Sequence, residues 1–248
     1  MFQRVIPSKS ILSRGIIPSV IILILTLSST QAQVRPSVIQ IISDPVHRNS
    51  KYMLLRYEKD RVIYGKYTDP RDGTQYKTIE LENNTWLAEN LRYEIPGTSF
   101  VYPGDPIHEE VYGRLYTWEA AIEACPEGWH LPTDSAWFGL ELQLGVADTL
   151  LETRGWRKCI GVASLKSDSG WLAATPSNDS LGFSALPGGF RDQEGYFFNE
   201  GYFAYFWTAT TADHSDAWYR VVTNDIPHVG RFSYSKAYAF SIRCVKPN

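Results

Sequence analysis

The stretch CPEGWHLPTDSAW, residues 125–137, interrupts a helical pattern with a cysteine, two prolines and a glycine. Pro126 is expected to end a helix over residues 116–124, because proline cannot continue a helix. Thr133 then stands where a helix N-cap belongs, and the carboxylate of Asp134 suits the positive end of a second helix. That second helix has apolar residues at helical spacing and a glycine that can end it: Trp137, Leu140, Leu144 and Gly145. The stretch is therefore predicted to be a hinge between two helices.

The hinge and five further blocks resemble the Fibrobacter succinogenes major paralogous domain family. The hinge follows GRLYTW at 113–118, and the other blocks are DG with YKT at 72–78, NTWLAENL at 84–91, GFSALPGGFR at 182–191, AWYR at 217–220 and SIRCV at 241–245. They follow the family's order and cover the chain from about Asp69 to its end. No activity is established for the family, so the resemblance implies a fold more than a function.

The implied fold is α+β and C-type-lectin-like, with two helices early and a strand-rich, loop-rich half closed by the C-terminal strand. After Gly182 the sequence has little helical periodicity and much Gly, Tyr, Phe and Trp. Short strands are expected there at residues 183–186, 188–191, 196–198, 202–208, 218–222 and 239–245.

Three earlier segments have their own patterns. A hairpin over residues 76–88 is expected to turn at Asn83 and Asn84, because Asn tolerates the positive φ of tight turns. Residues 97–113 are expected to be an ordered loop without regular structure. The partly basic segment 148–161 departs from the family's spacing and is expected to be an insertion packed on the surface.

The first 32 residues are predicted to be a secretory signal peptide. Basic residues precede an apolar core at residues 16–27, and Ala32 offers a cleavage position. A membrane anchor is the alternative, but Pro18 breaks the apolar run, which is shorter than the ~20 residues a spanning helix needs. We therefore expect a mature chain that begins at Gln33, has no stable membrane span and is secreted or held at the cell surface.

The charge balance argues against a nucleic-acid partner. The signal peptide holds three of the 24 Lys and Arg and none of the 27 Asp and Glu, so the mature chain has a net charge of 21 − 27 = −6. With 44% hydrophobic residues the chain can bury the core of one domain. The expected organisation is a signal peptide at 1–32, a β-rich extension at 33–68 with strands at 38–42, 52–57 and 61–67, and the family domain at 69–248.

Three cysteines in an exported chain suggest one disulfide and one remaining thiol. Cys125 lies at the end of the first predicted helix and Cys244 lies in the last predicted strand. A bridge between an early helix and the last strand is common in C-type-lectin-like folds, whereas the alternative is two buried free thiols. We expect the bridge, which leaves Cys159 as the odd thiol.

No residue pattern predicts a metal, a cofactor or a catalytic residue. The five histidines lack the i, i+4 spacing of paired ligands on a helix, and the acids Asp192 and Glu194 lack the repeated oxygen ligands of a calcium loop. Ser184 lies in GFSAL, which has no closing glycine of a nucleophile elbow. Formylglycine-generating enzymes resemble the same architecture and end similarly near an Arg-Cys pair such as Arg243-Cys244. Their paired copper-binding thiols would be missing here if Cys244 is bridged.

The remaining pattern is aromatic. Residues 195–207 hold too many rings for one face of one strand, so some are expected to point outward. Loops over residues 178–181 and 191–199 are expected to project on one side and to suit a glycan or a protein surface. The predicted ligand-binding residues are Arg191, Asp192, Glu194, Tyr196, Asn199 and Trp218, whereas Trp129, His130 and Trp137 are assigned to stability.

A secreted or cell-surface binding or adhesion module without catalysis is the leading hypothesis, with a glycan or a surface protein as its partner. The alternatives are a lectin-fold enzyme related to formylglycine generation and a structural envelope protein.

Overall fold

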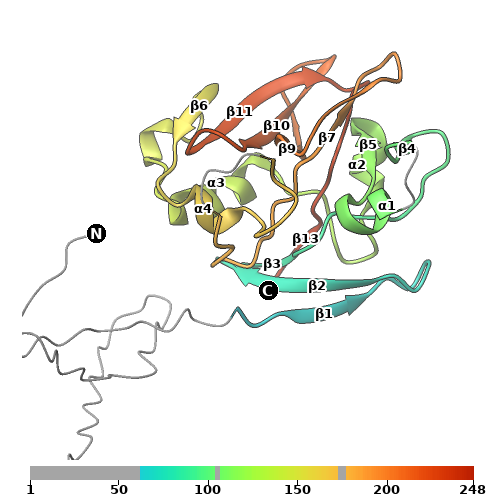
Figure 1. Cartoon of the computed structure of the whole chain (residues 1–248), viewed down its shortest axis with the longest axis horizontal. Coiled ribbons are helices and arrows are strands. Elements are labelled where there is room, and N and C mark those ends of the chain that lie inside the picture. The colour runs from blue at the N-terminus through green and yellow to red at the C-terminus, as the bar shows by residue number, and fades with distance from the viewer. Residues whose placement is uncertain (1–61, 104–106, 173–176) are drawn as a thin grey trace, which may run out of the picture. The chain divides into compact units, whose positions relative to one another are not determined.

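A computed structural model describes residues 62–103, 107–172 and 177–248 of the chain (Figure 1). These residues form a mixed α+β fold with more strand than helix, which confirms the expected class. The predicted signal peptide and the strands predicted at residues 38–42 and 52–57 lie outside the described residues. Among the helices of the described ranges, none is long and apolar enough to cross a membrane.

A small antiparallel sheet contains the first and the last strand described. It consists of β1 (Gly65–Thr68), β2 (Gln75–Leu81), β3 (Asn84–Leu87) and β13 (Val245–Pro247), in the order β1-β2-β3-β13. β1 lies within the segment 33–68 and pairs with β2 of the family domain. The β2–β3 hairpin is confirmed, but the positive φ falls on Glu82 (φ 54°) rather than on an asparagine.

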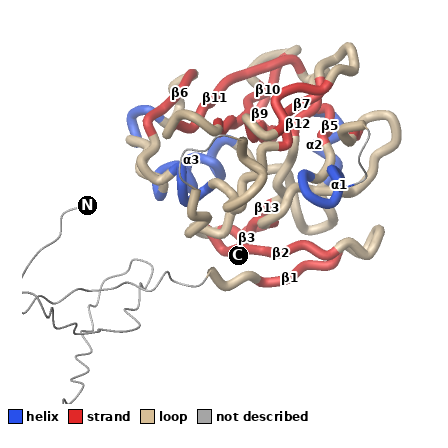
Figure 2. The backbone as a smooth tube through the Cα atoms, viewed as in Figure 1, coloured by secondary structure: helices blue, strands red, loops and turns tan. Residues whose placement is uncertain are grey.

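Nine strands of the described residues form a second sheet, which lies above the small one in Figures 1 and 2. In spatial order they are β4 (Ser99–Phe100), β5 (Leu115–Thr117), β12 (Ala239–Phe240), β7 (Gly188–Arg191), β9 (Phe203–Thr211), β10 (Asp216–Thr223), β11 (His228–Ser235) and β6 (Gly155–Lys158), with β8 (Phe197–Glu200) paired to β7.

The hinge joins two helices as predicted. The helices of the described chain are α1 (Ile107–Tyr112), α2 (Trp118–Ala124), α3 (Asp134–Gln143) and α4 (Val162–Leu165), with a 3-10 turn at Asp148–Leu150. Thr133 caps α3, because its Oγ1 accepts a hydrogen bond from the Ala136 N–H (3.3 Å). Gly145 ends the helix region with a φ of 83°. The apolar positions predicted on α3 are buried: Trp137, Leu140 and Leu144.

Four predictions of local structure are wrong. The segment 97–113 is not without regular structure, because it contains β4 and α1. The segment 148–161 is not a surface insertion, because it supplies β6 and buries Arg157 and Cys159. Residues 183–186 form only an isolated bridge at Ala185, and residues 239–245 are not one strand, because β12 and β13 belong to different sheets. No strand had been predicted for β11.

The large sheet buries apolar side chains on both faces. Neighbouring residues of a strand point to opposite sides, so one strand contributes to two cores. On one face, Phe206 and Val222 pack in a core with Trp137 of α3. On the other face, Trp207 and Val221 belong to a second core. That second core also contains Tyr116, Ala121 and Phe240.

The predicted disulfide is confirmed. Cys125, directly after α2, is bonded to Cys244, directly before β13, with an S–S distance of 2.08 Å and 119 residues of sequence separation. The hinge is also held to the last strand by its backbone, since His130 and Val245 exchange two hydrogen bonds of 2.9 Å. The His130 side chain is exposed, so its backbone and not its ring provides the structural contact.

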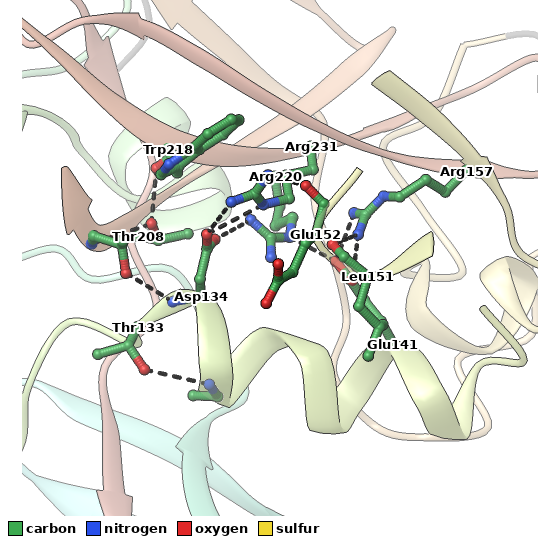
Figure 3. Close-up of polar contacts among 12 residues, drawn as sticks. Thr133, Asp134, Glu141, Leu151, Glu152, Arg157, Thr208, Trp218, Arg220 and Arg231 are labelled. Atoms are coloured by element: carbon green, nitrogen blue, oxygen red, sulfur yellow. Dashed lines mark hydrogen bonds and ion pairs between the residues drawn. The ribbon is translucent and has the colours of Figure 1, made fainter. Parts of the chain in front are cut away.

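A buried charged cluster joins α3 to the large sheet (Figure 3). It consists of Asp134, Glu141, Arg157, Arg220 and Arg231, and the two acids lie two turns apart on one side of α3. Arg220 reaches Asp134 through Nη1 and Glu141 through Nε, both at 2.5 Å. Arg157 pairs with Glu141 (2.7 Å) and Arg231 with Asp134 (2.6 Å). The cluster therefore fixes α3 against β6, β10 and β11.

Candidate ligand-binding surface

The hairpin of β7 and β8 carries five of the six residues predicted to bind a ligand. Asp192 closes its turn, because its N–H donates to the Tyr196 carbonyl (2.9 Å) and its Oδ1 accepts from the Tyr196 N–H (2.8 Å). Gly195 has a φ of 101°, which glycine adopts without the strain of a Cβ. The turn therefore has one defined shape and presents residues 193–196 at its tip.

The hairpin is anchored by two residues, Tyr102 before α1 and His108 in α1. The Tyr102 hydroxyl donates to the Phe198 carbonyl (2.5 Å), and a Cβ at Gly189 would lie 2.1 Å from both of these oxygens. Glycine at 189 is therefore required for this contact. His108 of α1 lies 3.4 Å from a carboxylate oxygen of Glu200 at the end of β8.

Three of the predicted polar residues are used to build the hairpin. Asp192 holds the turn, and Arg191 lies over the Phe100 ring (3.9 Å) and donates to the Asp192 carbonyl (3.2 Å). Asn199 adopts a φ of 66° and donates to the Tyr205 hydroxyl (3.0 Å). Glu194 accepts only from its neighbour Gln193 among the described residues, so its carboxylate stays at the exposed tip.

Aromatic rings lie exposed beside these polar groups. The Tyr196 side chain is 66% exposed at the tip, and Phe198 (43%) and Tyr202 (46%) follow on the same hairpin and its exit. Phe198 stacks on Phe190 with ring centres 5.3 Å apart, which holds its ring in place. The prediction that some rings of residues 195–207 point outward is therefore confirmed.

Trp218 does not belong to this surface. On β10 its side chain shares a face with that of Arg220, and its ring contacts Arg231 of β11. The neighbouring Tyr219 points to the opposite face, where it contacts Tyr205. Since the Asn199 side chain binds Tyr205, it lies on the face of the sheet opposite to Trp218.

A row of aromatic rings crosses four strands on the face of the sheet that carries Asn199, and only Tyr205 of this row lies in the segment whose rings were expected to point outward. Trp156, Phe232, Tyr219 and Tyr205 follow one another with ring centres 5.5, 6.1 and 5.9 Å apart. Burial raises the pKa of Tyr205 to about 12, so its hydroxyl stays protonated as a hydrogen-bonding group. Alternation of rings in β9 and β11 was the sequence pattern that could have revealed this row.

The loop at residues 178–181 is not part of the hairpin surface. The Asp179 carboxylate accepts from both the N–H and the hydroxyl of Ser184, and Tyr64 lies 3.5 Å from it. Burial raises the pKa of Asp179 above its ordinary value. The carboxylate of this loop is therefore turned toward the protein rather than toward a ligand.

An acidic hollow of about 590 Å³ lies elsewhere. It is lined by Asp72, Thr74, Arg92, Tyr93, Glu94, Glu109 and Glu110. Two of its carboxylates, Glu94 and Glu109, pair with Arg114 at 3.1 and 2.6 Å. These ion pairs join α1 to the segment after β3, which is a structural role.

The cysteines do not offer a pair of thiols. All three lie in the described residues, Cys125 and Cys244 are bonded to each other, and Cys159 is buried. Burial raises the pKa of the Cys159 thiol to about 12, so it remains protonated at neutral pH. Within residues 62–103, 107–172 and 177–248, no three His, Cys, Asp or Glu side chains gather as metal ligands would.

Comparison with known proteins adds a family. The model of the Fibrobacter succinogenes major domain matches residues 79–246, which is more than half of the chain. Neither a curated protein nor a solved structure gives a significant match.

Proposed function

We propose that this chain, which belongs to the Fibrobacter succinogenes major domain family, is a binding module without catalytic activity. The observation that carries the proposal is the tip of the β7–β8 hairpin, where the 66% exposed Tyr196 stands near the exposed carboxylate of Glu194. An anchored hairpin that holds such groups outward is pre-organised for a ligand.

A glycan is the ligand that we propose for this surface. Ring faces pack against the apolar faces of sugars, while carboxylate, amide and guanidinium groups pair with hydroxyls. Tyr196, Phe198 and Tyr202 supply the rings, and Glu194 supplies the carboxylate. A protein partner would use the same rings, so the ligand class is the outcome that the experiment decides.

We also propose that the module acts outside the cytoplasm, either secreted or at the cell surface. Residues 1–32 have the pattern of a signal peptide, and the Cys125–Cys244 bond suits an oxidising compartment. The C-type-lectin-like assignment of the fold is a proposal too. It is supported by a last strand that returns beside β3 and by the bond between that strand and the hinge.

Binding of the purified mature protein to an array of glycans and polysaccharides tests the proposed function. A glycan that binds the parent should lose affinity in Tyr196→Ala and in Glu194→Gln. The control is Leu142→Ala, which removes a side chain of 46% exposure from α3, on the opposite side of the sheet. Loss of binding in the control, or retention in both hairpin variants, would place the ligand elsewhere.

A further inference from the structure

β6 is the last strand at one end of the large sheet, and its outer edge pairs with no described residue (Figure 1). The Cys159 N–H donates to the Pro227 carbonyl (3.2 Å), which continues the ladder between β6 and β11. Backbone groups of an antiparallel strand alternate between its two sides, so Gly155 and Arg157 face β11. Trp156 and Lys158 therefore present their N–H and C=O groups outward.

The side chains of this edge also alternate. Arg157 points into the protein and is buried in the charged cluster. Trp156 and Lys158 share the opposite, solvent-facing side. The exposed Arg154 lies directly before β6, and its charge acts on Tyr219, whose ring lies on the same side as that of Trp156. Trp156 is 41% exposed and is supported from below by Phe232. The edge thus presents a basic, an aromatic and a basic side chain in a row.

We propose that β6 binds an acidic extended peptide segment of another protein as an added strand. The outward backbone groups of Trp156 and Lys158 would supply main-chain hydrogen bonds, as in other cases of strand addition. Arg154 and Lys158 would pair with acidic side chains at alternate positions of the peptide, and Trp156 would cover an apolar one between them. This surface is separate from the β7–β8 hairpin, and the proposal does not depend on a glycan ligand.

The positive charge of the β6 edge favours an acidic partner. The whole chain has a net charge of −3, so a basic edge strand is a local reversal of its electrostatics. A second copy of this chain is disfavoured as the added strand, because antiparallel pairing of two β6 strands brings Lys158 near Arg154 or Lys158 of the other copy. Like charges across two strands destabilise the pair, whereas an acidic strand is attracted to the same edge.

Hydrogen exchange with a peptide probe tests the proposal. The probe is a capped peptide in which glutamate, tryptophan and glutamate alternate with threonine, and its control carries lysine in place of glutamate. We expect the acidic probe to bind, with slower exchange of the Trp156 and Lys158 amides. Binding should weaken with added salt, because the charged groups are exposed. The lysine probe should not bind.

A matched pair of variants separates strand addition from simple charge attraction. Lys158→Pro and Lys158→Thr both remove the charge, but only proline removes the outward N–H, and proline is tolerated on an edge strand. Lys158→Pro should bind the acidic probe about tenfold more weakly than Lys158→Thr, the factor that one lost hydrogen bond of about 1.4 kcal/mol gives. Protected amides at Arg157 and Val229 in both variants would show that the β6–β11 ladder is intact.

Three results would overturn the proposal. Equal affinity of the two variants, or binding without protection of the Trp156 and Lys158 amides, would reduce the contact to charge alone. Absence of acidic-probe binding would remove the site. A dimer of the parent that Lys158→Pro dissociates would assign the edge to a second copy instead. None of these results depends on whether the hairpin binds a glycan.

Discussion

The guanidinium carbon of Arg231 lies 3.5 Å from the centre of the Trp218 ring. Arg231 also binds the Asp134 carboxylate through Nε and Nη2, at 3.1 and 2.6 Å. The indole therefore covers the outer end of the buried charged cluster (Figure 3). Covering the cluster is a structural role for Trp218.

Trp218→Ala should therefore lower the free energy of unfolding, by about 1–3 kcal/mol, and leave hairpin binding unchanged. Tyr196→Ala should instead weaken hairpin binding and change the free energy of unfolding by less than about 0.5 kcal/mol, because its ring is mostly exposed. Urea unfolding of the two variants, alongside binding of a glycan identified on the array, checks the pair. A Trp218→Ala protein with full stability and no glycan binding would show that Trp218 belongs to the ligand site.

Glu141 neutralises two arginines inside the protein. Glu141→Gln should destabilise the fold by about 3–5 kcal/mol, because Arg157 and Arg220 would lose their shared carboxylate while buried. Glu123→Gln, on the exposed side of α2, is the matched control and should change stability by less than about 0.5 kcal/mol. Equal unfolding midpoints in urea for the two variants would contradict this account of the cluster.

Asp69 should make stability depend on acid. Burial opposes its ionisation, but hydrogen bonds and charge from Arg71 outweigh burial and hold the pKa of Asp69 below its ordinary 3.8. The contribution of Asp69 to stability is therefore fully present at a pH above its ordinary pKa of 3.8. It is lost as the pH falls through the lower pKa of the folded state. Asp69→Asn should be less stable than the parent at about pH 6, with the difference shrinking below about pH 3. A difference that stays constant over this range in urea unfolding would refute the pairing.

The disulfide should stabilise the fold mainly by restricting the unfolded chain. For a loop of 119 residues the chain-entropy estimate is about 4–5 kcal/mol. The double variant Cys125→Ala/Cys244→Ala should lose about this much, and reduction of the parent should act similarly. Cys159→Ala is the control, and its unfolding should remain sensitive to reductant. A non-reducing peptide map that links Cys159 to either partner would rule out the observed bond in solution.

Export is tested at the N-terminus. Protein recovered from its native host should begin at Gln33 and be found outside the cytoplasm, because cleavage is expected after Ala32. N-terminal sequencing decides the matter. An intact Met1 on protein in the inner membrane would identify residues 16–27 as an anchor.

The sequence predicted the features that depend on residues close together in the chain or on the residue type alone. Thr133, Gly145 and the apolar positions of α3 were correct because capping and helical spacing act within a few residues. The Cys125–Cys244 bond was predictable because only three pairings of three cysteines exist and the family resemblance favoured one. Five of the six predicted site residues share one hairpin for the same reason, since they are neighbours in sequence.

The errors came from partners that are distant in sequence. Arg157 looked like a surface residue because Glu141, which neutralises it, lies on α3. Trp218 was grouped with the hairpin residues because alternation does not say which face of a sheet a ring will occupy until the neighbouring strands are known. β11 was missed although its rings alternate, since Gly230 interrupts the pattern where the Trp156 and Phe232 rings need space.

The Cys125–Cys244 bond also decides how the protein bears tension. Both ends of the described domain lie in the small sheet, because β1 pairs with β2 and β13 pairs with β3. A force that pulls residues 62 and 248 apart can lengthen the chain before Cys125 and the few residues after Cys244. The disulfide transmits the force directly between Cys125 and Cys244, so the force bypasses the residues between these two cysteines. All the strands from β6 to β12 fall within that bypassed loop, so the force does not extend the chain of the hairpin itself.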